Sequence, residues 1–271
     1  MMDISLGAFS FWGEISAGRM NVFGYLETVK HRYGLETVDL WNGLYEERSE
    51  YVWTPANDEV LHDIRAALEE RRLRLSNIAI DRAHVWEPDE QVRAALKSNA
   101  LRQIRAAHLL KAKTIRIDAC YRNTETMTED AFAYTVDTFR EYAELAASCG
   151  MRVGPENHMG QSTDARWMKR LAEAVDHPAF GILLHLGRWK EGSGGDGDVA
   201  AHAYHIHVDI RTLNERSLPE KAHLLLADGY AGDWAVEYNP SANPYDEIGW
   251  ALADVQKTVL AEKGNLAKTN S

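Results

Sequence analysis

Cysteine is scarce in this 271-residue sequence, which contains only Cys120 and Cys149. A fold held together by a disulfide framework needs more pairs than this, so that class is excluded, and we expect a reducing, cytoplasmic compartment. No catalytic signature surrounds Cys120, so we interpret it as an incidental thiol near a strand end. The first residues lack a basic region followed by an apolar core, so we expect no signal peptide.

Long apolar runs and an excess of positive charge are also missing. No apolar run is long enough to cross a bilayer, so we expect no membrane partner. The 41 acidic residues outnumber the 30 Lys and Arg, giving a net charge of −11. This balance opposes nucleic acid as a partner, because nucleic-acid binding needs clustered Lys and Arg. No glycine-rich phosphate loop follows the first predicted strand, which disfavours an open doubly wound sheet, the alternative fold.

The sequence does contain a regular alternation of strand and helix patterns. The predicted strands cover residues 4–9, 36–41, 74–80, 114–118, 151–156, 180–186, 204–210 and 235–238. Helical patterns separate them, and the last one covers 244–263. Eight strand–helix units in this length predict an α/β fold, a single (β/α)8 TIM barrel over residues 1–264. Residues 265–271 are expected to form a frayed tail.

Capping residues mark the ends of several predicted helices. Asn57 or Thr54 lies near the start of the helix at 56–72, and Thr128 precedes two acidic residues at the start of another. Gly150 is a natural C-terminal residue for the helix that Thr128 begins. These signals support the alternation of elements.

Strand parity identifies the side chains that face the barrel interior. In the seventh strand Ile206, Val208 and Ile210 form the apolar set. Successive side chains of a strand point to opposite faces, so the alternating polar set must face inward. The same parity in other strands gives an inward polar set of Asp39, Trp41, Arg116, Asp118, Arg152, Glu156, His185, His205, His207, Asp209 and Glu237.

Four of these residues form a candidate metal site. Glu156, His185, His207 and Glu237 are separated by 29, 22 and 30 residues (185−156, 207−185, 237−207), which is one strand–helix unit each. This spacing places one candidate ligand on each of four neighbouring strands. Buried ionisable groups need compensation, and two carboxylates with two imidazoles are suitable ligands for a divalent metal ion. No local motif such as HExxH is present, so the prediction depends on the repeated position.

Four segments carry a resemblance to a known family. They are Gly-Pro-Glu-Asn-His-Met-Gly at 154–160, Leu-His-Leu-Gly at 184–187, His-Ile-His-Val-Asp at 205–209 and Trp-Ala-Val-Glu-Tyr at 234–238. The sequence resembles the xylose isomerase-like TIM barrels (sugar phosphate isomerase/epimerase, AP endonuclease family 2) over essentially its whole length. That superfamily holds sugar isomerases and epimerases, hydroxypyruvate isomerase, inosose dehydratase and endonuclease IV-type enzymes.

The resemblance implies one divalent metal ion. In epimerase-like members the ligands are a glutamate after strand five, an aspartate after strand six, a histidine or glutamine in strand seven and a glutamate after strand eight. Glu156, His207 and Glu237 match this pattern, whereas His185 stands where the family usually has aspartate. Arg188 stands where the family often has a substrate-binding histidine. The additional nitrogen ligand favours Mn, Zn, Co or Fe over Mg.

The resemblance also implies proton transfer next to a carbonyl group of a small carbohydrate or keto acid. The metal would bind substrate oxygens and stabilise an enediolate, while Glu156 and Glu237 exchange the proton from opposite sides, as in an isomerase or epimerase. The candidate substrate-binding residues are His158, Arg188, Arg211, Trp41 and His84, and His205 and Asp209 are candidate supports behind the metal ligands.

Other interpretations remain open from the sequence. The barrel could be a lyase, either a dehydratase resembling inosose dehydratase or a C-glycoside-cleaving type, or a noncatalytic binding subunit. Endonuclease activity is disfavoured by the acidic charge and by the lack of further His and Asp ligands. A homo-oligomer is an open alternative, because the sequence shows no interface signature that would decide the oligomeric state. As structural alternatives, Glu156 or Glu237 would pair with Arg116 or Arg152, His205 would be a core histidine, Trp41 and His84 would be packing residues, and Arg188 and Arg211 would be loop charges.

Overall fold

Eight parallel strands form the centre of the computed structural model, which describes residues 3–238 and 243–269. They are β1 (Ile4–Leu6), β2 (Thr37–Trp41), β5 (Arg74–Ile80), β6 (Thr114–Ile117), β7 (Arg152–Gly154), β8 (Ile182–His185), β9 (Ala203–Val208) and β10 (Asp233–Val236). They form two four-stranded arcs, β2-β5-β6-β7 and β8-β9-β10-β1. Isolated bridges join the arcs, Gly7 to Asp39 on one side and Val153 to Phe180 and Glu156 to Leu183 on the other. The predicted (β/α)8 barrel is confirmed.

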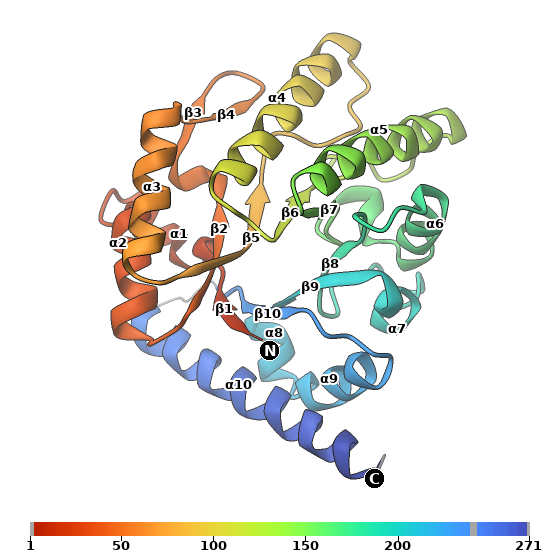
Figure 1. The fold of residues 1–271 in the computed structure, drawn as a ribbon. Coiled ribbons are helices and arrows are strands. Elements are labelled where there is room, and N and C mark those ends of the chain that lie inside the picture. The colour runs from red at the N-terminus through yellow and green to blue at the C-terminus, as the bar shows by residue number, and fades with distance from the viewer. Residues whose placement is uncertain (1–2, 239–242, 270–271) are drawn as a thin grey trace.

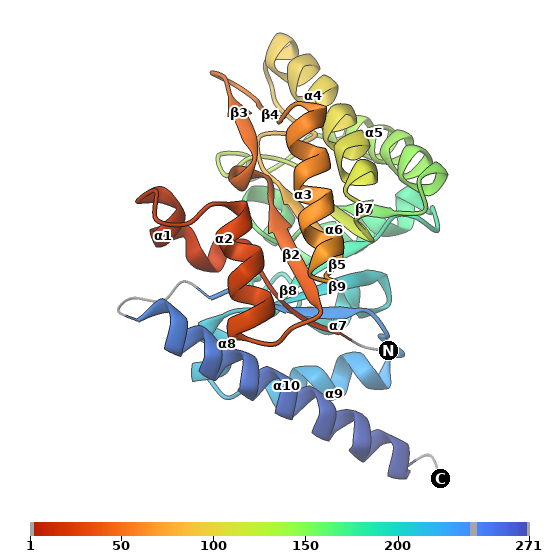
Figure 2. The ribbon, with the colours of Figure 1, turned by 60° about the vertical axis from the view of Figure 1, so that its left-hand side comes forward.

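Helices surround these strands, as Figures 1 and 2 show. The longer ones are α3 (Asp58–Glu70), α4 (Glu90–Leu109), α5 (Glu129–Ser148), α6 (Ala165–Val175), α9 (Leu218–Ala227) and α10 (Pro244–Thr269). The shorter ones are α1 (Trp12–Ser16), α2 (Val22–Glu27), which a π-helical turn continues, α7 (Asp196–Val199) and α8 (Ile210–Asn214). Within the described ranges, no helix combines the length and apolar character that crossing a bilayer requires.

Side-chain caps fix where several helices begin. Asn57 Oδ1 accepts a hydrogen bond from the Val60 amide at 3.0 Å, so Asn57 rather than Thr54 is the cap of α3. Thr128 Oγ1 accepts from the Ala131 amide at 3.2 Å at the start of α5. These bonds satisfy amides that have no partner inside the helix, as the sequence predicted.

Tight packing brings β7 and β8 together below the candidate site. Ile182 and Leu184 of β8 and Ile206 of β9 are fully buried, as expected for the apolar residues that alternate with the inward polar ones. A Cβ atom on Gly154 would lie 1.7 Å from the carbonyl oxygen of Gly181, so a side chain at this position would separate the two strands. This close approach places the end of β7 beside the end of β8.

Several strand ends are shifted, and β1 ends at Leu6 rather than at residue 9 because Ala8–Phe11 form a 3-10 helix. Three further elements differ from the sequence predictions. Ile210 does not belong to β9, because Asp209 accepts from the Thr212 amide at 2.9 Å and caps α8 instead. A hairpin of β3 (Glu46–Arg48) and β4 (Trp53–Pro55) was not predicted, because strands of three residues are too short to show a period. The expected frayed tail from residue 265 is wrong for 265–269. There α10 continues, since leucine, alanine and lysine favour a helix.

Candidate active site

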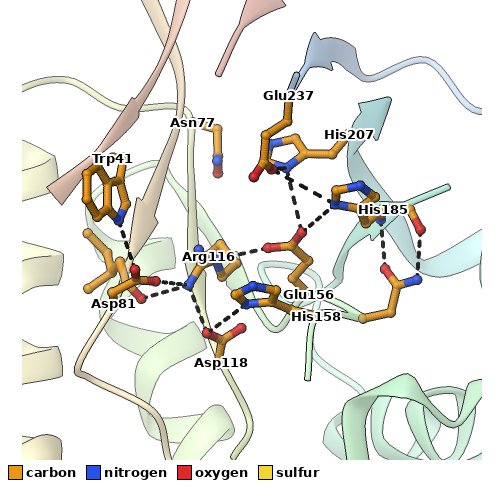
Figure 3. A network of polar contacts seen from close by, with 12 residues as sticks. Trp41, Asn77, Asp81, Arg116, Asp118, Glu156, His158, His185, His207 and Glu237 are labelled. Atoms are coloured by element: carbon orange, nitrogen blue, oxygen red, sulfur yellow. Dashed lines mark hydrogen bonds and ion pairs between the residues drawn. The ribbon is translucent and has the colours of Figure 1, made fainter. Parts of the chain in front are cut away.

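Four side chains converge where strands β7 to β10 end. Glu156 follows β7, His185 ends β8, His207 lies in β9 and Glu237 follows β10. One possible ligand atom from each lies within 4.8 Å of the other three. Figure 3 shows the four side chains facing one another. The repeated spacing in the sequence therefore does bring these residues together.

Each imidazole turns its Nδ1 atom toward the two glutamates. His207 Nδ1 lies 2.7 Å from Glu237 Oε2 and 3.7 Å from Glu156 Oε1. His185 Nδ1 lies 2.9 Å from Glu156 Oε1 and 3.9 Å from Glu237 Oε2. Glu156 and both histidines are at most 2% exposed. The donor set is thus compact, buried and made of two nitrogens and two carboxylates.

An aspartate lies behind each imidazole. Asp39 Oδ2 is 2.7 Å from His207 Nε2, and Asp209 Oδ2 is 3.3 Å from His185 Nε2. Metal-binding histidines commonly donate their second N–H to a carboxylate, which directs the lone pair of the other nitrogen at the metal. Asp39 makes this hydrogen bond with His207, whereas Asp209 lies within ion-pair distance of His185 Nε2, which has no hydrogen-bond partner among the described residues.

The buried Nδ1 atom of His207 supports the metal assignment. Among the described residues it has no hydrogen-bond partner of acceptable geometry, although Glu237 Oε2 is 2.7 Å away. Buried polar atoms rarely lack a hydrogen bond without a reason. A nitrogen of this kind beside two carboxylates fits a divalent metal ion with mixed nitrogen and oxygen ligands.

Asp39 connects His205 to this centre. Its Oδ2 atom is shared, lying 2.9 Å from His205 Nε2 and 2.7 Å from His207 Nε2. Its Oδ1 atom accepts a hydrogen bond from Asn77 Nδ2 at 2.9 Å. His205 therefore lies behind the candidate ligands and reaches them only through Asp39.

The buried charges stabilise one another. Burial alone would raise the pKa of Asp39, but His207 and His205 hold it well below its usual range. Burial likewise opposes ionisation of Glu156, but His158, His185, His207 and Arg116 together hold its pKa well below that of an ordinary glutamate. The carboxylates are therefore ionised at neutral pH, and the neighbouring imidazoles and Arg116 balance their charge.

Arg116 binds the other side of Glu156, as Figure 3 shows. Its Nε atom lies 3.2 Å from Glu156 Oε2, and its Nη1 atom lies 2.8 Å from both Asp81 Oδ1 and Asp118 Oδ2. The ion pair between Glu156 and Arg116 considered from the sequence is present. The ion pair leaves Glu156 Oε1 facing the imidazoles, so it does not prevent Glu156 from being a metal ligand.

A cavity of about 380 Å³ opens above Glu156, His207 and Glu237. Its volume falls within the range of small-molecule sites. One wall is aromatic, where Trp41 packs against three other rings at centroid distances of 5.3 to 5.9 Å. Those rings belong to Phe9, Trp12 and Trp53. The cavity thus combines a polar floor with an apolar wall.

Three of the candidate substrate-binding residues line this cavity, namely Trp41, His84 and His158. Trp41 Nε1 donates a hydrogen bond to Asp81 Oδ2 at 2.9 Å. His158 Nδ1 lies 3.5 Å from Asp118 Oδ2. Both polar contacts link the walls of the cavity to the network around Arg116.

The other two candidates do not reach the cavity in the part of the chain that the structure describes. Arg211 donates to the carbonyl of Gly187, and the carbonyl of Arg188 accepts from Asn157 Nδ2 at 3.3 Å. Arg152, weighed as an ion-pair partner for the glutamates, donates instead to the carbonyl of Phe180 at 3.0 Å.

Further cavity residues come from loops that sequence patterns did not single out. Asp81 and Arg82 directly follow β5, and Tyr121 and Arg122 follow β6. Their position after predicted strand ends was the available signal, because loops at this end of a TIM barrel build the active site. Trp53 lies in the unpredicted hairpin, for which the sequence offered no signal.

Several solved structures share this fold. An L-ribulose 3-epimerase gives a TM-score of 0.77 at 13% identity, covering 100% of this chain and 99% of that one. A D-psicose 3-epimerase from Clostridium cellulolyticum H10 gives 0.74 at 14%, covering 95% and 99%. The probable 3-DHS dehydratase AsbF from Bacillus anthracis gives 0.67 at 16%, covering 94% and 99%. At these identities the likeness shows the fold alone.

Sequence comparison gives the family. No curated protein matches the chain. The family model described as xylose isomerase-like TIM barrel matches residues 29–246, which includes the strands that carry Asp39, Glu156, His185 and His207 and the position of Glu237. The chain therefore belongs to the xylose isomerase-like TIM barrel family.

Proposed function

We propose that this protein is a metal-dependent isomerase or epimerase that transfers a proton next to a carbonyl group of a small carbohydrate or keto acid. The observation that carries the proposal is the pair of imidazoles whose Nδ1 atoms face Glu156 and Glu237, each with an aspartate at its Nε2 atom. Sugar epimerases among the structures of the same fold support it.

The residues that would hold the metal ion are Glu156, His185, His207 and Glu237. Such an ion, when bound, supplies Lewis-acid polarisation of a carbonyl oxygen and of the neighbouring hydroxyl. Two imidazole ligands favour Mn, Zn, Co or Fe over Mg.

The two glutamates would carry the proton. Glu237 has a side chain that is 15% exposed and lies on the cavity floor, so it can meet a substrate directly. Glu156 also lines the floor, but Arg116 binds its Oε2 atom and fixes its orientation. A carboxylate within hydrogen-bond reach of the substrate can take a proton from one carbon position and return one to it or its neighbour.

A lyase is the second candidate, and His158 favours it. This histidine lines the cavity beside Asp118, so it supplies a third group able to hold a proton. Elimination needs an acid for the leaving group in addition to a base for the carbon acid. A probable dehydratase is among the structures of the same fold, which is consistent with such a reaction.

Solvent isotope exchange tests the proposal. The protein is stripped with a chelator, reloaded separately with Mn, Zn, Co, Fe or Mg, and incubated with keto sugars and keto acids in deuterium oxide. Metal-dependent deuterium at the carbon next to the carbonyl is expected by NMR, and Glu237→Gln should abolish it. Glu220→Gln, at an exposed position of α9, is the matched control and should retain exchange.

The products separate the alternatives. Deuterium uptake without net loss of water supports the isomerase or epimerase. Release of water or of an aglycone supports the lyase. Absence of both metal binding and exchange contradicts the two enzymatic functions and leaves a noncatalytic binding subunit.

A further inference from the structure

Two arginine side chains line the cavity without a carboxylate partner. Arg82 follows β5 and Arg122 follows β6. Their guanidinium carbons lie 5.5 and 5.3 Å from the ring centroid of Tyr121, and that of Arg82 lies 6.0 Å from the ring of Trp53. Over residues 3–238 and 243–269, neither guanidinium forms an ion pair or a side-chain hydrogen bond.

Other described arginines, such as Arg102 and Arg105 of α4, also lack an ion pair, so what distinguishes Arg82 and Arg122 is that they line the cavity. Elsewhere, partly exposed arginines such as Arg19, Arg32 and Arg71 pair with nearby carboxylates. In the same cavity Arg116 is fully engaged by its three carboxylates. The charges of Arg82 and Arg122 are therefore available to a ligand.

The backbone at Arg82 has a strained conformation, which indicates that the surrounding structure holds this residue in a defined position. Its φ angle is +56°. The other described non-glycine residues with positive φ are Arg72, Lys111, Asp176 and Arg216, and each lies at the C-terminus of a helix, where this conformation is ordinary. Arg82 follows a strand instead. Strained residues of this kind persist where the surroundings enforce them, often at ligand sites.

Two fully buried asparagines enforce this conformation. Asn42 donates from Nδ2 to the Asp81 carbonyl at 3.1 Å and accepts at Oδ1 from the Asp81 amide at 3.0 Å. Asn99 Nδ2 donates to the Arg82 carbonyl at 3.0 Å. Both amides are inaccessible to solvent. The turn that directs Arg82 into the cavity is thus fixed from two sides, by the segment after β2 and by α4.

We propose that the substrate carries an oxyanion, a carboxylate or phosphate, at the end away from its carbonyl group, and that Arg82 and Arg122 bind this oxyanion. The inference rests on the proposed function, which places the carbonyl at the cavity floor. A guanidinium group presents several N–H donors in a planar arrangement that matches carboxylate and phosphate oxygens. Both guanidinium groups lie over the Tyr121 ring, within 5.5 Å of its centroid. A neutral sugar would leave both charges without a partner.

A matched set of ligands tests this. D-fructose, D-fructuronate and D-fructose 6-phosphate share the ketone end and differ only at carbon six. Their dissociation constants are measured by calorimetry at low ionic strength, with the metal-loaded and with the metal-free protein. At least one anionic ligand should bind roughly tenfold or more tightly than fructose, and the better of the two identifies the oxyanion.

Arginine variants give the controls. Arg82→Gln combined with Arg122→Gln should remove the preference for the anion, so that the anions and fructose bind with similar affinity. Arg105→Gln, at an exposed position on α4, removes the same charge away from the cavity and should keep the preference. The preference should also persist without metal, because the arginines do not contact the candidate ligands.

Two results overturn the inference. One is fructose binding as tightly as both anions, or neither anion binding. The other is an anion preference that survives in the double variant. The proposed function fails by a different measurement, the absence of metal-dependent deuterium exchange, so the two failures are distinguishable.

Discussion

Replacing Asp39 with asparagine tests the support behind the candidate metal ligands. Asp39 lies in β2 and carries the oxygen that both His205 and His207 contact through Nε2. Asparagine has the same shape but no charge. One carbonyl oxygen can still accept from the two imidazoles, although the charge-assisted character of both hydrogen bonds is lost.

The structure indicates how much metal affinity the Asp39→Asn variant should lose. Loss of a carboxylate behind a metal-binding histidine typically lowers metal affinity by about 10- to 100-fold, which corresponds to about 1.4–2.8 kcal/mol. His185 keeps its own aspartate, Asp209, so we expect the loss to come through His207 alone.

The metal-free fold should also lose stability. With its oxygen toward the imidazoles, the new amide would present its NH2 group to Asn77 Nδ2, which now donates to Asp39 Oδ1 at 2.9 Å. Asn77 can then turn over and donate to Thr114 Oγ1, which still donates to the Ser76 carbonyl. The loss of stability therefore comes from the two weakened hydrogen bonds to His205 and His207 and should be about 1–2 kcal/mol.

Two assays separate these effects. Metal affinity is measured by competition with a chromophoric chelator, and the stability of the metal-free protein by urea unfolding. Asp233→Asn is the matched control, because Asp233 is equally buried but pairs with Lys113 at 2.9 Å, outside the candidate site. It should lower stability and leave metal affinity unchanged.

The reasoning is refuted if folded Asp39→Asn protein binds the metal as tightly as the wild type. An equal loss of affinity in Asp233→Asn would also refute it, because the effect would then come from general destabilisation.

Three other changes have defined outcomes. His185→Asp restores an oxygen ligand and should shift metal selectivity toward Mg relative to Zn. If competition binding shows the same ratio of Mg to Zn affinity as in the wild type, that result contradicts the role of His185 as a ligand. Arg82→Gly should raise the free energy of unfolding by about 1 kcal/mol because it relieves the positive φ, whereas Arg82→Gln should give no gain in urea unfolding. Burial raises the pKa of Glu46 from 4.5 to about 7, against the lowering effect of its Arg48 partner. The folded protein therefore retains a proton that the unfolded chain has lost, and the free energy of unfolding should fall as the pH rises through this window. Glu46→Gln should flatten that dependence in unfolding curves measured at about pH 5 and about pH 8.

The sequence predicted the barrel and the four converging side chains because both depend on regular periods. Alternation along β9 separates His207 from the apolar Ile206 and Val208, and this distinction needs no knowledge of loops. The spacing between Glu156 and Glu237 spans whole strand–helix units, so their meeting follows from closure of the barrel.

Contacts between distant strands were less accessible to prediction. Strand parity predicted that Asp39 faces the barrel interior. It did not predict that Asp39 contacts both His205 and His207, because this contact depends on how the two arcs are aligned with each other. Nothing in the sequence marks Arg82 for a positive φ, where glycine or asparagine is the usual residue. Arg211 was a candidate substrate-binding residue, but its side chain donates to the carbonyl of Gly187 instead.

The two arcs of the barrel give the candidate site a mechanical role. Few backbone bridges join the arcs, whereas Glu156 and Asp39 come from one arc and contact His185 and His207 of the other. The side chains of the site therefore connect the two arcs at both places where the arcs meet, between β1 and β2 and between β7 and β8. A bound ion would add contacts between residues of both arcs, so loading with metal should slow amide hydrogen exchange in β1, β2, β7 and β8 together. Occupancy of the site and cooperativity of the fold are thereby linked.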